Sequence, residues 1–188
     1  MRTRLLVLSC VALLVIAAVR DSLMPAARAF ATENAPAAPA FTHRNPDDWI
    51  NSPPLTWADL KGRVVLLDFW TYACINCYRS IPWLHEVESR YGARGLRIIG
   101  VHTPELPFEY LRGNVQKKIT EYKLTNPVML DNNHSYWKAM GNQYWPAFYL
   151  VDKAGRVRAV FAGETHSGED NARDMEGIIE RLLAEPAS

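Results

Sequence analysis

Two cysteines, separated by two residues, stand between a strongly apolar run and a helical pattern. The run covers residues 64–70 (VVLLDFW) and is typical of a strand that is buried on both faces. From residue 74 to residue 91, apolar residues recur at helical spacing. The pair Cys74 and Cys77 is therefore predicted at the start of a helix that directly follows a buried strand.

This placement favours thiol–disulfide chemistry. The unpaired N–H groups and the positive dipole end of a helix N-terminus stabilise a thiolate at Cys74, and the thiolate is the nucleophile. The spacing lets Cys77 reach Cys74 within the first helical turn, so Cys77 can resolve a mixed disulfide that Cys74 forms. A purely structural disulfide and half of a zinc site are the alternatives. A zinc site needs further ligands, and the sequence has no second cysteine pair.

Several other residues are candidates for the same site. Burial near the end of the apolar run would raise the pKa of Asp68, which suits a proton acceptor for the resolving thiol; an aspartate bonded to backbone is the alternative. A cis Pro146 would leave the backbone of Trp145 free to pair with a substrate strand, although a trans turn proline is the default. An apolar substrate-binding rim, with at least one member in the core, is predicted from Trp70, Tyr72, Ile75 and Trp145.

Glu105 is a candidate modulator of the cysteine pKa values because it follows the second predicted strand; an exposed loop carboxylate is the alternative. The scattered residues Glu164, His166 and Glu169 are interpreted as solvated. No metal and no cofactor are expected.

The remaining pattern predicts an α/β protein with a mixed sheet. Helices are predicted over residues 108–122, 134–140 and 169–184, the first interrupted at Gly113-Asn114. Strands are predicted over residues 96–101, 127–130, 147–151 and 157–161, the last two as an antiparallel pair.

The N-terminus has the pattern of an export signal. Arg2 and Arg4 precede an apolar run over residues 5–19, and a small-residue cleavage site follows at Ala27-Arg28-Ala29. The run is short for a membrane span, so residues 1–29 are predicted as a signal peptide, with an uncleaved anchor as the alternative.

The rest of the chain divides into an alanine- and proline-rich linker over residues 30–46 and one domain over residues 47–188. Cleavage after residue 29 removes four arginines and one aspartate, which takes the formal net charge from +1 to −2. A slightly acidic domain argues against nucleic acid as a partner.

The run from Asp68 to Cys77 (DFWTYACINC), with GVHTPE over residues 100–105 and YWPA over residues 144–147, resembles the thioredoxin superfamily. More narrowly, it is similar to exported TlpA-like redoxins and to the C-terminal domain of DipZ-type proteins. The resemblance implies a thioredoxin-like fold, in which helices flank a mixed central sheet, with a TlpA-type insertion between Leu106 and His134. It also implies that Cys74 attacks, Cys77 resolves, Asp68 is the buried carboxylate and Pro146 is cis.

The expected function is that of an exported thiol–disulfide oxidoreductase. It is expected to reduce disulfides of envelope proteins, as in cytochrome c maturation, rather than to oxidise their thiols. Its expected partners are protein dithiols and disulfides and a membrane electron donor. The expected location is the periplasm or another extracytoplasmic space, with membrane contact only if the N-terminal segment is an uncleaved inner-membrane anchor.

Two alternatives of other classes stay open. One is a peroxidase of the peroxiredoxin type, which Thr71 favours and Leu67 opposes because Leu67 stands where such enzymes have proline. The other is a non-enzymatic binding module whose disulfide is structural.

Overall fold

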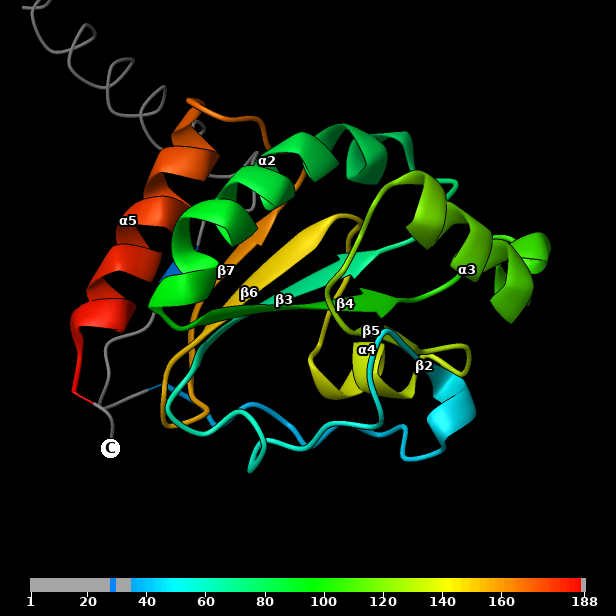
Figure 1. The fold of residues 1–188 in the computed structure, drawn as a ribbon, viewed down its shortest axis with the longest axis horizontal. Helices are drawn as coiled ribbons and strands as arrows, with labels where there is room; N and C mark the ends of the chain where they lie inside the picture. Colours follow the sequence, from blue (N-terminus) through cyan, green and yellow to red (C-terminus); the bar gives the residue numbers. More distant parts are fainter. Residues whose placement is uncertain (1–27, 30–34, 187–188) are drawn as a thin grey trace, which may run out of the picture.

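The computed structural model describes residues 28–29 and 35–186, and its centre is a mixed β-sheet. Within that part of the chain, seven strands lie in the order β1-β7-β6-β3-β4-β5-β2 (Figure 1). β3, β4 and β5 run parallel, and the other adjacent pairs are antiparallel. The strands are β1 (Arg28–Ala29), β2 (Trp49–Ile50), β3 (Val64–Trp70), β4 (Leu96–His102), β5 (Val128–Leu130), β6 (Ala147–Val151) and β7 (Val157–Ala162).

Helices pack on both faces of this sheet. The α-helices are α2 (Ile75–Tyr91), α3 (Arg112–Glu121), α4 (Ser135–Ala139) and α5 (Asp170–Ala184). The short 3-10 helices are η2 (Pro46–Asp48), η3 (Gly92–Arg94) and η4 (Pro107–Tyr110). α2 and α5 cover one face (Figure 1), where Trp83 packs edge-on against Phe148 with ring centroids 5.2 Å apart. The fold is the α/β sandwich that the sequence predicts.

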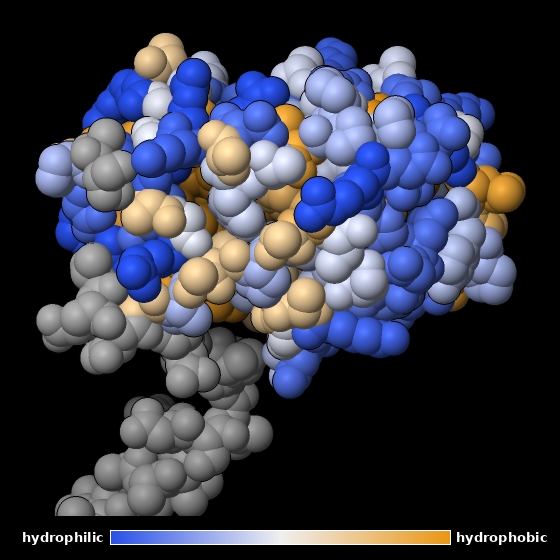
Figure 2. All heavy atoms as spheres, turned by 90° about the horizontal axis from the view of Figure 1, so that it is seen from below, coloured by the Kyte–Doolittle hydropathy of each residue, from blue (hydrophilic) through white to orange (hydrophobic). Residues whose placement is uncertain are grey.

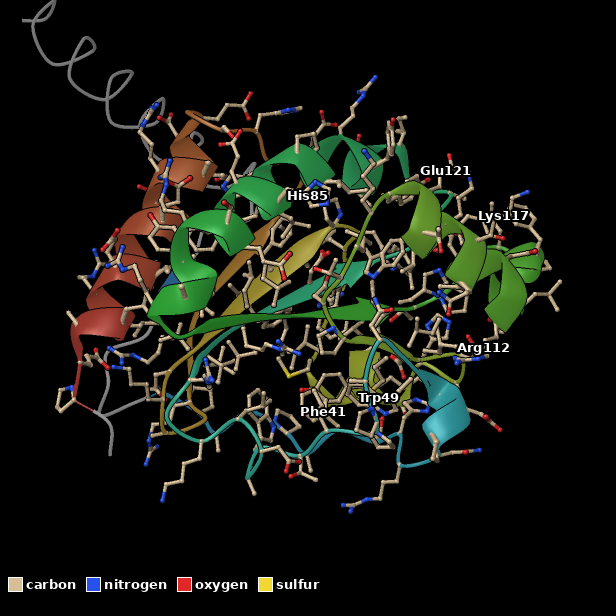
Figure 3. All side chains as sticks on the ribbon, viewed as in Figure 1. Phe41, Trp49, His85, Arg112, Lys117 and Glu121 are labelled. Atoms are coloured by element: carbon tan, nitrogen blue, oxygen red, sulfur yellow. A yellow bond between two sulfur atoms is a disulfide. The ribbon has the colours of Figure 1, made fainter. Side chains whose placement is uncertain are left out.

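The opposite face is covered by α4 and by the segment that precedes β3. Phe41 is buried there, stacked on Trp57 at 5.0 Å and packed against Tyr136 at 5.1 Å. Figure 3 shows Phe41 and Trp49 on the side of the sheet away from α2. Figure 2 views this side of the molecule. Strongly hydrophobic atoms are visible there mainly in recesses between hydrophilic side chains.

The prediction of a linker over residues 30–46 is therefore wrong for residues 35–46. Ala35, Ala38 and Phe41 are all buried, and the backbone N–H of Ala38 donates to Gly155 O at 2.8 Å. The physical reason is that Phe41 supplies enough apolar surface to hold an otherwise spacer-like segment in place. The packed domain begins before residue 47.

The prediction for residues 108–122 also needs correction. The chain forms η4 and α3 there, and the break between them falls at Leu111, which is extended (φ −79°, ψ 109°), rather than at Gly113-Asn114. α3 is tied to the start of β2, because Arg112 donates from Nη1 to the carbonyl oxygens of Asp47 and Trp49 at 3.0 and 2.9 Å (Figure 3).

The predicted signal peptide, residues 1–29, lies outside the described residues apart from Arg28 and Ala29, which pair with β7. Among the described residues, the structure has no helix with both the length and the apolar character needed to cross a membrane.

Candidate active site

Cys74 and Cys77 are joined by a disulfide at the start of α2, with their Cα atoms 5.3 Å apart. Cys74 is the N-cap residue of the helix, and its sulfur accepts the backbone N–H of Cys77 at 3.2 Å. Cys74 is half-buried, whereas Cys77 is only 4% exposed. A substrate sulfur can therefore approach Cys74 from solvent, while Cys77 is shielded behind it.

Asp68 lies under the helix that carries the cysteines. Residues two apart on a strand share a face, so Asp68 and Trp70 both point from β3 towards α2. Asp68 is 7% exposed, and burial raises the pKa of its carboxyl group to about 7. The shift has the direction that burial predicts, and it leaves the carboxyl group able to exchange a proton near neutral pH.

The Trp145–Pro146 peptide bond is cis, as the resemblance implies. The indole N–H of Trp145 donates to Thr103 O at 3.1 Å, and its ring packs on Trp137 at 4.2 Å. The hydrogen bond holds the loop before β6 against the segment that follows β4, and the ring contact holds it against α4.

Only part of the predicted apolar rim is accessible to a substrate. Ile75 is 57% exposed, and Tyr72 and Trp145 are half-buried, but Trp70 is 3% exposed and packs beside Cys77. Trp70 is therefore a core residue, because its ring lies across β4 under α2. Beside Cys74 there is a hollow of about 200 Å³, lined by Tyr72, Ala73, Cys74, Ile75, Tyr78, Glu121 and Tyr122.

A buried carboxylate that the sequence reasoning missed stands next to this hollow. Glu109 is fully buried, and its Oε1 accepts the hydroxyl of Thr71 and the backbone N–H of Ala73, the latter at 2.9 Å. Its Oε2 accepts the backbone N–H groups of Glu105 and Leu106 at 2.9 and 2.7 Å. The side chain of Glu105 itself is exposed, so its predicted role as modulator has no contact here to support it.

Burial by itself would raise the pKa of Glu109, but its four hydrogen bonds outweigh burial and hold the pKa below the ordinary range. His102 is also fully buried, with Nε2 3.4 Å from the Thr71 hydroxyl oxygen. Burial lowers the pKa of His102 to about 4, so the imidazole is neutral at pH 7. The sequence signal for Glu109 is faint. A glutamate at the third position of a helix that begins at Pro107 predicts a contact with the N-cap residue Leu106. It does not predict the contacts with Thr71 and Ala73.

A thioredoxin-like fold that presents a cysteine pair at disulfide distance at a helix start, together with relatives named as thiol-disulfide oxidoreductases, defines a thiol–disulfide oxidoreductase. The chain belongs to the Redoxin family, whose model matches residues 24–179. This confirms the resemblance to redoxins of the TlpA and DipZ type.

Individual relatives agree with this membership. Protein DipZ of Mycobacterium tuberculosis is 46% identical over 138 residues, which are 72% of this chain and 19% of DipZ. The thiol-disulfide oxidoreductase YkuV of Bacillus subtilis is 29% identical over 138 residues, 73% of this chain and 88% of YkuV. The crystal structure of a DsbF homologue from Corynebacterium diphtheriae shares the fold with a TM-score of 0.69 at 20% identity, covering 85% of this chain and 96% of that one. The chain thus spans about a fifth of the DipZ length.

Proposed function

We propose that the protein is an exported reductase of disulfides in envelope proteins, of the kind that prepares apocytochromes c. The observation that carries this proposal is the unequal exposure of a linked cysteine pair at a helix start, with half-buried Cys74 in front of buried Cys77. Export rests on the sequence of residues 1–29, and the reducing direction rests on the residues between the cysteines, Ile75 and Asn76. Neither carries a positive charge that would strongly stabilise a thiolate.

In the proposed reaction, the Cys74 thiolate attacks one sulfur of a substrate disulfide, and the other substrate sulfur leaves as a thiolate and takes up a proton. Cys77 then loses its proton to the Asp68 carboxylate and attacks the Cys74 sulfur, which releases the second substrate sulfur as a thiolate. That thiolate takes up a proton from solvent, and Asp68 returns its proton to solvent. Two electrons pass from the Cys74–Cys77 dithiol to the substrate. A membrane electron donor must then reduce the new disulfide.

The substrate chain is proposed to lie across the exposed residues beside Cys74. Ile75 and the hollow next to it offer apolar contacts, and the backbone of Trp145, ahead of Pro146, offers main-chain hydrogen bonds to an extended segment. The Thr71 hydroxyl donates to the buried carboxylate of Glu109, so its proton is not available to a peroxide bound at Cys74. That contact weighs against the peroxidase alternative.

The test is an insulin-reduction assay on the domain from residue 30 onward, with dithiothreitol as the electron source. The wild-type domain should accelerate insulin reduction, and Cys74→Ala should lower the rate to that of dithiothreitol alone. Full activity in Cys74→Ala, or hydrogen peroxide consumption that rivals insulin reduction, would contradict the proposal.

A further inference from the structure

Glu109 connects two segments that meet beside the reactive cysteine. On one side, it accepts hydrogen bonds from Thr71 and Ala73, which form the loop between β3 and Cys74. On the other side, it accepts the N–H groups of Glu105 and Leu106, which follow β4. All four partners are donors, so the site is built for an ionised carboxylate and has no place for the NH₂ group of an amide.

The charge on this carboxylate is not balanced by a cation. Glu109 forms no ion pair with any residue that the structure describes. The nearby imidazole of His102 is fully buried and neutral at pH 7, and within the described part of the chain its side-chain hydrogen bond is with the Thr71 hydroxyl. Hydrogen bonds stabilise the carboxylate, but they leave its net negative charge in the interior.

That charge lies close to the reacting sulfur. Oε1 of Glu109 is 2.9 Å from the Ala73 nitrogen. Standard bond lengths allow at most about 8 Å from that nitrogen to the Cys74 sulfur, which places the carboxylate within about 11 Å of it. With an effective dielectric constant of about 20, a unit charge at this distance changes an ionisation equilibrium by about tenfold.

We infer that Glu109 is a positioning residue that holds the loop before Cys74 and whose negative charge disfavours the Cys74 thiolate, making the cysteine pair a stronger reductant. The reduced enzyme carries the thiolate and the disulfide form does not, so a nearby anion destabilises the reduced form alone. The inference rests on the proposed attacking role of Cys74.

The experiment measures the equilibrium between enzyme disulfide plus dithiothreitol and enzyme dithiol plus oxidised dithiothreitol. Glu109→Gln removes the charge, so the constant should move about fivefold towards the enzyme dithiol, which corresponds to about 20 mV. The rate of Cys74 alkylation by iodoacetamide should also reach its half-maximum at a lower pH.

Thr71→Val separates the charge from the anchoring of the loop. The variant removes the hydroxyl that donates to Glu109 and keeps the carboxylate, whose negative charge is then stabilised by one hydrogen bond fewer. The equilibrium constant for exchange with dithiothreitol should therefore move about twofold towards the enzyme disulfide, opposite to the effect of Glu109→Gln. A residue that only held the loop would give the same direction in both variants. If Glu109→Gln does not fold, Thr71→Val is sufficient as a test. An unchanged equilibrium constant in Thr71→Val, or a constant that moves towards the enzyme dithiol, would overturn the inference.

Glu121→Gln is the matched control. Glu121 also lines the hollow beside Cys74, but it is exposed and paired with Lys118 at 2.9 Å, and Figure 3 shows it on α3 near the start of α2. Its removal should change the constant by less than about twofold because exposed charges are screened. An equal effect of Glu121→Gln and Glu109→Gln would overturn the inference. A wild-type enzyme that does not exchange with dithiothreitol would instead contradict the proposed function.

Discussion

Cys74 and Cys77 differ in exposure, and the proposed reaction gives them separate steps for that reason. Cys74 is half-buried and Cys77 is buried behind it, so Cys77→Ser should leave attack intact and prevent resolution. We predict that Cys77→Ser accumulates a mixed disulfide with a cysteine-containing substrate, measured by intact-protein mass spectrometry. Cys74→Ser is the control and should give none. An adduct that forms on Cys77 in the Cys74→Ser protein would reverse the assignment.

The burial of Asp68 links stability to pH. Its pKa is raised to about 7 in the folded protein, above the ordinary value of 3.8, so this group destabilises the fold increasingly as pH rises from about 4 to 7. At 1.36 kcal/mol per unit of pKa, the cost above pH 7 is about 4 kcal/mol. We predict that Asp68→Asn makes the disulfide form more stable by about 2–4 kcal/mol at pH 8 and by much less at pH 4.

Urea unfolding at the two pH values measures this difference. The same variant should slow the resolving step, because Cys77 loses its proton acceptor. An Asp68→Asn protein whose stability gain is the same at pH 4 and pH 8 would contradict the raised pKa of Asp68.

The cysteines and Asp68 could be recognised from the sequence because they belong to a short motif whose members are close together in the chain. The cis state of Pro146 followed only from the resemblance, since a trans proline is the default for the residues alone. Glu109 could not be recognised in this way. Its partners Thr71 and Ala73 are 38 and 36 residues away, and only the pairing of β3 with β4 brings those segments together. Contacts that depend on tertiary structure leave no local pattern in the sequence.

At the scale of secondary-structure elements, the arrangement of β3 and β4 depends on the absence of a side chain at Gly100. Gly100 pairs with Asp68, and a Cβ placed on Gly100 would lie 2.9 Å from the indole nitrogen of Trp70. We predict that Gly100→Ala displaces the Trp70 ring and destabilises the protein by about 1–3 kcal/mol, measured by urea unfolding with Trp fluorescence.

Gly113→Ala is the control for this prediction. Gly113 lies in the first turn of α3, and a Cβ there would meet nothing within 4 Å, so the substitution should be neutral or stabilise by up to about 1 kcal/mol. A Gly100→Ala protein as stable as the Gly113→Ala protein would show that Trp70 does not need this space.

A nearly continuous apolar run made β3 predictable to within a residue, and apolar residues at helical spacing did the same for α2. The same reasoning misplaced the break between η4 and α3, because Gly113 looks like a helix breaker. A glycine in the first turn is tolerated. Leu111 is the C-cap of η4 and the N-cap of α3, and an N-cap residue takes extended dihedral angles. A leucine side chain, exposed here, does not signal a cap position, so the break could not be placed from the sequence.

At the scale of the whole molecule, the segment over residues 35–46 is part of the packed domain. Alanine and proline content predicted a spacer up to residue 46, but Phe41 is buried between the sheet and Trp57. We predict that a chain starting at residue 47 is less stable than one starting at residue 35 by about 3–5 kcal/mol, the cost of losing a buried phenylalanine. Thermal and urea unfolding of the two chains measure the difference. Equal stabilities would restore the spacer interpretation.

The proposed function requires the whole molecule to work as a reductant. The most direct test is the reduction potential of the Cys74–Cys77 couple, obtained by equilibrating the domain in dithiothreitol or glutathione buffers and following Trp fluorescence. We predict a value near the roughly −270 mV of thioredoxin, which requires an electron supply from a membrane donor. A value near the roughly −120 mV of a strong periplasmic oxidant would contradict the account and make the protein a disulfide donor.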